Sequence, residues 1–246
     1  MDPSVKHRKV SDAEWADIKE EQSKIPYKQA VGSLIYLACG TRPDIAFSTT
    51  YMSQFNERPS DLHWRSIKHI LRYLKETKHL SLDFKKTGEH VKVYSDADWA
   101  ADHVDRKSFS GYVVTLGGAA VSWSSKKQPC VALSSAEAEY LALAHAVKEA
   151  IWIKGLLDEL GAQEFIGSSV NVYTDNQAAM FIAKNQTTSE RSKHIDIRYH
   201  FIRCHVEEKT ISLEYVPSKN NIADVLTKTV KKPVLLHTRK LLGLSE

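Results

Sequence analysis

The spacing of apolar residues changes once along this 246-residue chain, near residue 80, and that change limits the folds open to it. Up to about Lys78 the spacing is helical, with apolar side chains at i, i+3 and i+4. Beyond it, apolar and polar residues alternate over four short runs, which predicts four strands. The runs are residues 81–84, 91–96, 109–118 and 119–125. We therefore expect helices first and then an antiparallel meander over residues 91–125.

Helical and strand patterns alternate after the meander. A long helix is predicted between Ser134, which forms a capping box with Glu137, and Gly161, which ends it. The later segments are predicted as a strand (169–175), helices (176–185 and 189–209), a last strand (211–217) and a helix that opens within 218–230. This order is typical of an α/β fold.

Glycines are predicted to mark the turns of the meander. Gly88, Gly111 and the pair Gly117–Gly118 are interpreted as turn or bulge points. Two adjacent glycines between strands predict a tight hairpin. We place a domain boundary near Gly88.

Composition leaves the class of partner open. The chain carries 34 basic and 30 acidic residues, a net charge of +4, which permits a nucleic-acid partner without requiring one. Its cysteines, Cys39, Cys130 and Cys204, have no paired spacing, so we expect a reducing intracellular compartment. No apolar run approaches the roughly 20 residues of a membrane span, and the N-terminus lacks the apolar region of a secretory signal.

Two predicted strands end in aspartates. Asp96 closes the first strand of the meander and Asp175 closes the strand after the long helix. A single such acid is usually a turn residue. Two strands of an α/β sheet can lie side by side and parallel, however, and both acids would then meet at the sheet edge where such folds place their sites.

The long helix offers two glutamates, Glu137 and Glu139. At about 100° per residue, Glu139 falls on the small apolar stripe with Ala142 and Ala146, which is the face that would press on the sheet. An acid buried there is costly unless a metal or a hydrogen-bond donor meets it. Glu137 lies roughly opposite and is used in the capping box. We therefore select Glu139.

A fourth acid, Asp224, opens a late predicted helix, where it could also simply favour the helix dipole. Together with Asp96, Glu139 and Asp175 it makes an oxygen-rich set that suits Mg²⁺ or Mn²⁺. Two such ions about 4 Å apart can stabilise both the attacking and the leaving oxygen of a phosphodiester displacement.

Five ordered stretches resemble the ribonuclease H domain of copia-type retrotransposon Pol polyproteins. They are YSDADW (94–99), SWSSKKQPCVALSSAEAEYLAL (122–143), VYTDNQAAMFIAKN (172–185), SKHIDIRYHFIR (192–203) and NNIADVLTK (220–228). Two earlier stretches, GSLIYLACGTRPDIAFS (32–48) and HWRSIKHILRYLKETK (63–78), resemble the reverse-transcriptase tail and connection of the same elements. The resemblance runs from about Lys24 to Lys232.

The resemblance implies a ribonuclease H-like fold. This is an α/β fold with a mixed five-stranded sheet, made of a three-strand antiparallel meander plus two parallel strands, and flanked by helices. It also implies a division into a mobile lead-in (1–23), a helical reverse-transcriptase tail or connection (24–88), a ribonuclease H domain (89–232) and a C-terminal helical tail (233–246).

The implied activity is hydrolysis of the RNA strand of RNA–DNA hybrids with two Mg²⁺ ions, for which Mn²⁺ can substitute. The catalytic and metal-binding acids would be Asp96, Glu139, Asp175 and Asp224, with Asp98 as an auxiliary acid. Contacts to RNA 2′-hydroxyls are expected from small polar side chains beside the acids, namely Ser134, Ser135, Asn176 and Gln177. Phosphate contacts are expected from Lys126, Lys127, Arg191, Lys193, His194 and Arg198.

Two departures from cellular ribonucleases H stand out. The loop before Asp224 is the short PSKNN (217–221), which has no histidine, and the segment GAQEFIGSS (161–169) has no basic run like the protrusion of bacterial enzymes. Hybrid binding would then depend on the residues above or on the connection helices. In the last of these helices Arg65, Lys68, Arg72 and Lys75 either follow a phosphate backbone or form an ordinary solvated face.

The chain has no paired-aspartate turn of a polymerase, so it is not expected to polymerise DNA. We interpret it as a polyprotein fragment or a truncated copy, with the reverse-transcriptase and integrase portions as partners, no membrane partner, and a place in cytoplasmic virus-like particles or the nucleus. Two other interpretations stay open: a silent remnant that only binds nucleic acid, and an exonuclease or integrase of similar fold. A zinc site is not expected, because His194, His200 and His205 do not share one helical face.

Overall fold

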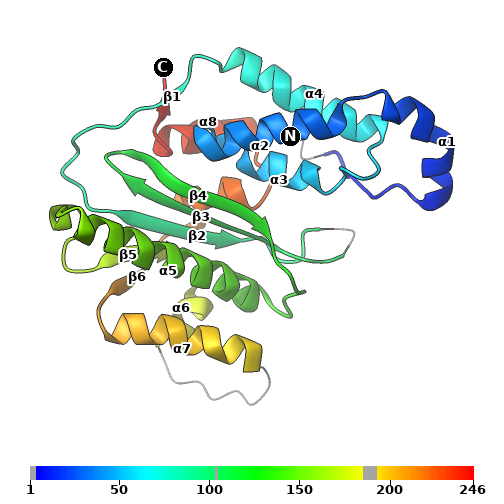
Figure 1. Ribbon diagram of the computed structural model, residues 1–246. Helices are drawn as coiled ribbons and strands as arrows, with labels where there is room; N and C mark the ends of the chain where they lie inside the picture. The colour runs from blue at the N-terminus through cyan, green and yellow to red at the C-terminus, as the bar shows by residue number, and fades with distance from the viewer. Residues whose placement is uncertain (1–3, 103–104, 185–192) are drawn as a thin grey trace.

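A five-stranded sheet lies at the centre of the computed structural model, between two layers of helices (Figure 1). The structure describes residues 4–102, 105–184 and 193–246, with the side chains of residues 193–197 outside that description. Long helix α5 (Ser135–Glu159) covers one face of the sheet, with α6 and α7 beyond it, and the N-terminal helices cover the other.

The strand order is β4-β3-β2-β5-β6. Strand β2 pairs antiparallel with β3 and parallel with β5, while β3–β4 is antiparallel and β5–β6 parallel. The strands are β2 (Lys92–Ala97), β3 (Phe109–Leu116), β4 (Ala119–Lys127), β5 (Val170–Thr174) and β6 (Ile211–Tyr215). The predicted ribonuclease H-like sheet, a meander plus two parallel strands, is therefore confirmed.

Helices precede the sheet and alternate with its later strands, as the apolar spacing predicted. Those before it are α1 (Asp12–Ser23), α2 (Tyr27–Gly40), η1 (Pro43–Ile45), α3 (Ala46–Ser53) and α4 (Asp61–Glu76). The later ones, besides α5, are η2 (Gln163–Phe165), α6 (Gln177–Lys184), α7 (Lys193–Glu207), η3 (Ser218–Asn220), η4 (Ile222–Leu226) and α8 (Lys232–Leu241). Within the described chain none of these helices has the length and apolarity to cross a membrane.

Three local expectations need correction. The run at 81–84 contributes only β1 (Ser81–Leu82), which pairs with β7 (Leu244–Ser245) in a separate two-stranded sheet, because the chain end supplies its partner. The predicted helix opening near Asp224 is the single 3-10 turn η4. The predicted lead-in contains α1, which begins at a capping box of Ser11 and Glu14.

The glycine predictions had mixed outcomes. Gly117 and Gly118 adopt φ of 61° and 77° and join β3 to β4 as a two-residue hairpin, as expected. Gly111 is neither a turn nor a bulge, because it lies inside β3 opposite Asp96. The irregularity of β3 falls between Val114 and Thr115 instead.

Neighbouring residues of β3 point into two different cores. Val114 packs with the α5 side of the sheet, and Val113 packs with the N-terminal helices, as alternation along a strand requires. The second core joins Leu34 and Ile67, from before residue 88, to Leu226 of the later chain. Residues on both sides of the predicted boundary thus share one apolar cluster, and the domain limits stay a prediction.

A buried ion pair ties η1 to α4. The guanidinium of Arg42 donates to both carboxylate oxygens of Asp44, at 2.9 and 2.7 Å, and to the backbone carbonyl and hydroxyl of Thr77. The hydroxyl of Tyr73 donates to Asp44 at 2.5 Å. Both charges of this pair are almost fully shielded from water.

We expect Asp44→Ala to lower the free energy of unfolding by about 3–5 kcal/mol, because it leaves the Arg42 guanidinium buried without a counter-charge. Urea unfolding measures this change. The matched control Lys154→Ala removes the partly exposed pair with Asp158 and should cost less than about 1 kcal/mol. Equal losses in the two variants would contradict a structural role for the buried pair.

Candidate active site

Three carboxylates meet at the carboxyl end of β2 and β5. Tyr94 of β2 pairs with Tyr173 of β5, so Asp96 and Asp175, two residues further along each parallel strand, arrive at the same edge. Glu139 reaches the same place from the second turn of α5. One oxygen from each of the three lies within 4.8 Å of the other two. The structure thus brings together three of the four predicted acids.

The helical face decides which glutamate enters this group. Glu139 is buried, and its neighbours on the same stripe, Ala142 and Ala146, are buried with it. Glu137 stays half-buried, and its carboxylate accepts the backbone N–H of Leu133 at 2.7 Å. Ser134 caps the helix by accepting the N–H of Glu137 at 3.1 Å. The structure therefore buries Glu139 rather than Glu137, although the reciprocal arm of the predicted capping box reaches Leu133 and not Ser134.

Burial and mutual repulsion raise the pKa of two of these acids. Burial comes first for both Asp96 and Glu139, and the charges of their neighbours, including Asp175, add to it. Oε2 of Glu139 is buried and has no hydrogen-bond partner among the described residues. A hard divalent cation would satisfy this oxygen and lower the pKa values of Asp96 and Glu139. The donor set therefore fits Mg²⁺ or Mn²⁺.

Turn η4 brings the fourth predicted acid near the other three without adding it to their group. Asp224 is half-buried and forms an ion pair with Lys228. Its charge helps to raise the pKa of Asp96, which places it within electrostatic range. The hydroxyl of Thr227, at the end of the same turn, donates to Asp96.

A glycine and an asparagine fix η4 against the sheet. A Cβ at Gly111 would lie 2.7 Å from Cβ of Leu226 and 3.0 Å from Cγ2 of Thr227, so only glycine allows this approach. The side chain of Asn221 donates to the carbonyl of Ser95 at 2.9 Å and accepts the N–H of Ala223. These contacts hold Asp224 and Thr227 beside the end of β2.

Asp98 forms hydrogen bonds with the backbone of the first residue of β3. Its carboxylate accepts the backbone N–H of Phe109, and its own N–H donates to the carbonyl of Phe109 at 3.1 Å. Burial, followed by the charge of Asp96, raises the pKa of Asp98 to about 7, although the Phe109 hydrogen bond opposes the shift. Asp98 therefore closes the end of the β2–β3 pair, and its auxiliary role stays a prediction.

The small polar residues predicted to contact RNA lie around this edge. Ser134 and Ser135 are exposed at the start of α5, and Gln177 is exposed at the start of α6. Asn176 is half-buried, and its side-chain oxygen accepts the N–H of Ala179, so it caps α6. The caps at Ser134 and Asn176 give both residues a structural task besides any contact with substrate.

The predicted phosphate-binding residues divide into three groups. Lys126 is exposed and Arg198 is half-buried. The ammonium of Lys127 is bound to Asp102, Asp105 and Gln54 at 2.6–2.9 Å, which disfavours a phosphate contact. Lys193 and His194 lie in α7, but their side chains, like the whole of Arg191, fall outside the described residues.

Four residues around the site escaped the sequence analysis as members of it: Gly111, Asn221, Thr227 and Lys228. The last three belong to the stretch from which only Asp224 was selected. Lys228 is the most informative of them, because its charge lowers the pKa of Asp96, Asp98 and Glu139. Its spacing of four residues from Asp224 on a helical turn was the available signal.

Comparisons with known proteins agree with the fold and the motifs. The Retrovirus-related Pol polyprotein from transposon TNT 1-94 of Nicotiana tabacum is 42% identical over 245 residues, which cover 98% of this chain and 18% of that protein. No family model matches the chain. The chain thus spans less than a fifth of the length of this relative.

One solved structure shows a likeness of fold at low sequence identity. A foamy viral protease-reverse transcriptase in complex with double-stranded DNA aligns with 85% of this chain and 35% of its own, at 13% identity and a TM-score of 0.50. LC11-RNase H1 in complex with an RNA/DNA hybrid aligns with 56% of this chain and 93% of its own, at 19% identity and a TM-score of 0.40.

We expect Gly111→Ala to lower the free energy of unfolding by about 1–3 kcal/mol, because the new methyl group pushes η4 away from β3. Gly155→Ala is the control, since nothing lies within 4 Å of a Cβ there and alanine favours a helix by up to about 1 kcal/mol. Chemical denaturation should therefore show opposite signs for the two variants. A neutral Gly111→Ala would contradict the close packing of η4.

In the metal-free protein, the contribution of Asp96 and Glu139 to the free energy of unfolding should fall as pH rises above about 4, the ordinary carboxyl pKa of the unfolded chain. The folded state holds protons on Asp96 and Glu139 that the unfolded state has already lost, so raising the pH favours unfolding. Thermal melts in a chelator between about pH 5 and 8 test this sign. Relative to the parent, Glu139→Gln should gain melting temperature as pH rises from about 5 to 8, because it lacks the carboxyl group whose pKa is raised. A difference between the two proteins that does not change with pH would contradict the buried repulsion.

Proposed function

Because this chain belongs to the Pol polyproteins of copia-type retrotransposons, we propose that it is a ribonuclease H that hydrolyses the RNA strand of RNA–DNA hybrids during reverse transcription. The observation that supports this most is the meeting of Asp96, Glu139 and Asp175 at one sheet edge. An oxygen-only group of this kind suits metal-assisted phosphoryl chemistry. The products would carry a 3′-hydroxyl and a 5′-phosphate.

The three clustered carboxylates, with Asp224 beside them, would hold two Mg²⁺ ions, for which Mn²⁺ can substitute. Bound there, the ions would activate the attacking water and stabilise the leaving 3′ oxygen. The protein's own part is to fix the ligands. Thr227 orients Asp96 through its hydroxyl, and the apolar stripe of α5 presses Glu139 into place.

Lys228 is proposed to balance charge at this edge. Its ammonium pairs with Asp224 and lies within the field of Asp96 and Asp175. Three or four acids gathered without a cation repel each other and a phosphodiester as well. A fixed ammonium reduces that repulsion while a polyanionic substrate approaches.

Selection of RNA is proposed to rest on 2′-hydroxyl contacts in the minor groove. Ser135 and Gln177 are exposed at the ends of α5 and α6 nearest the acids, and Ser134 and Asn176 lie next to them. Lys126 and Arg198 are the described cations that remain from the predicted phosphate contacts. The reverse-transcriptase and integrase portions of a parent polyprotein are proposed as partners.

The direct test is cleavage of a labelled RNA–DNA hybrid in Mg²⁺. We expect Asp96→Asn and Glu139→Gln each to lower the rate at least about 100-fold, because each removes a charged oxygen ligand. Glu137→Gln, two residues away and outside the group, should stay within about threefold of the parent.

Three outcomes would overturn parts of the proposal. If the parent binds the hybrid but does not cleave it in Mg²⁺ or Mn²⁺, the chain is a remnant that only holds nucleic acid. If Glu139→Gln stays active while Glu137→Gln loses activity, the wrong glutamate has been assigned. Cleavage of double-stranded DNA at the same rate would contradict the selection of hybrids.

A further inference from the structure

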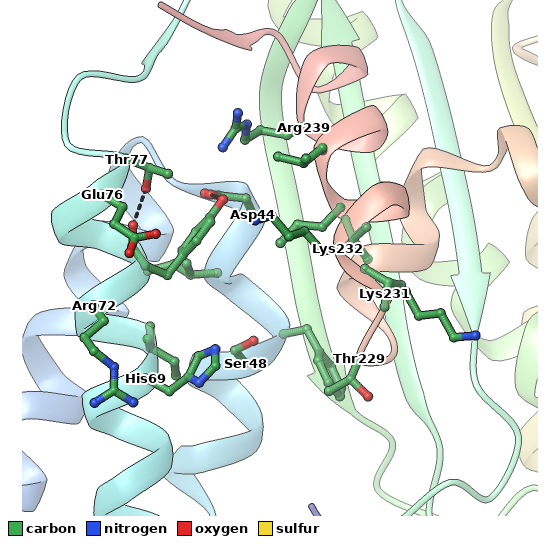
Figure 2. Close-up of a pocket in the computed structure, with 18 of the residues that line it drawn as sticks. Asp44, Ser48, His69, Arg72, Glu76, Thr77, Thr229, Lys231, Lys232 and Arg239 are labelled. Carbon is green, nitrogen blue, oxygen red and sulfur yellow. Dashed lines mark hydrogen bonds between the residues drawn. The ribbon is translucent and has the colours of Figure 1, made fainter. Parts of the chain in front are cut away.

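A groove of about 760 Å³ lies between α4 and the chain segment from Lys228 to Arg239, which includes most of α8 (Figure 2). Residues of η1 and α3, such as Asp44 and Ser48, form its floor. Arg72 lines it from the α4 side, and Lys231 and Lys232 line it from the start of α8. The three segments come from distant parts of the sequence.

The charge of this groove is positive. Its lining contains the cations Arg72, Lys228, Lys231, Lys232 and Arg239 and the acids Asp44, Glu76 and Glu246. Asp44 is neutralised by Arg42, and Glu246 shares a hydrogen bond with His79. Even with Lys228 paired to Asp224, the remaining cations of the lining outnumber the two remaining acids, Glu76 and Glu246. A net positive concave surface attracts polyanions.

Three of the cations are available to a ligand. Arg72, Lys231 and Lys232 are exposed and form no ion pair with the residues that the structure describes. Lys231 occupies the N-cap of α8 without a side-chain cap bond, so the positive end of this ten-residue helix adds to their field. On α4, the neighbouring Lys68 and Lys75 are exposed as well but do not line the groove.

The groove is connected to the candidate active site through Lys228. This residue lines the groove, and its ammonium pairs with Asp224 and acts on Asp96 and Asp175. Val225 of η4 also belongs to the lining. The positively charged lining of the groove therefore lies directly beside the carboxylates of the candidate active site.

We propose that this groove binds the sugar–phosphate backbone of the hybrid at a distance from the scissile bond. The inference rests on the proposed function, which supplies the hybrid as the ligand. Cations bind the phosphates, while the partly exposed apolar lining residues Val230 and Leu235 can meet the sugars. The groove would thus bind the hybrid in place of the basic protrusion of bacterial enzymes, for which the segment 161–169 has no basic run.

The test compares two triple variants with equal change of charge. The groove variant is Arg72→Gln, Lys231→Gln and Lys232→Gln, and the control is Lys68→Gln, Lys75→Gln and Lys240→Gln on the same two helices outside the groove. Binding of a labelled hybrid of about 20 base pairs, two helical turns, is followed by fluorescence anisotropy at several salt concentrations. An Asp96→Asn background with Mg²⁺ keeps the ligand intact.

The groove variant should bind the hybrid about tenfold more weakly, and the slope of log Kd against log salt should fall by about 0.9 for each phosphate that the protein no longer neutralises. The control should stay within about twofold of the parent. With Asp96 restored, the groove variant should raise KM and leave kcat unchanged, because phosphate contacts far from the reaction stabilise ground state and transition state alike. Single substitutions should each give part of the change in slope.

The outcomes separate the groove from the catalytic proposal. Equal weakening in both triple variants, with normal cleavage by the parent, would overturn the groove and leave the ribonuclease standing. Loss of hybrid binding in the groove variant alone, with no cleavage by the parent, would support the groove and overturn the catalytic proposal. A parent that neither binds nor cleaves the hybrid would overturn both.

Discussion

Repulsion between buried carboxylates is the constraint on which the candidate site depends. Asp96, Glu139 and Asp175 bring oxygens within 4.8 Å of each other in a largely buried space. Burial disfavours the charged forms of Asp96 and Glu139, and the charges of the neighbouring acids add to that cost. A folded protein can hold such a group of acids when a bound cation or a proton neutralises part of its negative charge. The ammonium of Lys228 lowers part of this electrostatic cost. Oε2 of Glu139 has no hydrogen-bond partner among the described residues, and a metal ion bound there would lower the cost further.

The scaffold places these charges through close backbone contacts. The parallel register of β2 and β5 fixes the two aspartates, and the small residues of α5 allow Glu139 to reach them. On the other face, Gly111 lets η4 approach β3 closely enough for Thr227 to bind Asp96. The N-terminal helices share their core with η4, so these helices support the turn that lies beside the site. The same helices form one wall of the positive groove.

Periodicity predicted the elements and the helix glutamate, because those depend on residues near each other in the chain. Alternation marked β2 through β4, and the 3.6-residue period separated Glu139 from Glu137. Contacts between residues far apart in the sequence produce no periodic pattern, so they could not be predicted in this way. Gly111 was interpreted as a turn or bulge point because a glycine in a strand does not show which element packs on it. Lys127 was taken for a phosphate contact, although Asp102 and Asp105 hold its ammonium, and β1 found its partner at the far end of the chain.

The central claim is that the buried carboxylates are a divalent-metal site that exchanges protons for the ion. Calorimetric titration of the protein with Mg²⁺ near pH 7, repeated in buffers with different ionisation enthalpies, measures that exchange directly. The account predicts binding with release of protons, because burial and the neighbouring acids raise the pKa of Glu139 to about 9, so that it holds a proton near pH 7 in the metal-free protein. Glu139→Gln should weaken the binding and reduce the release. Binding without proton release, or no binding of Mg²⁺ or Mn²⁺, would contradict the account.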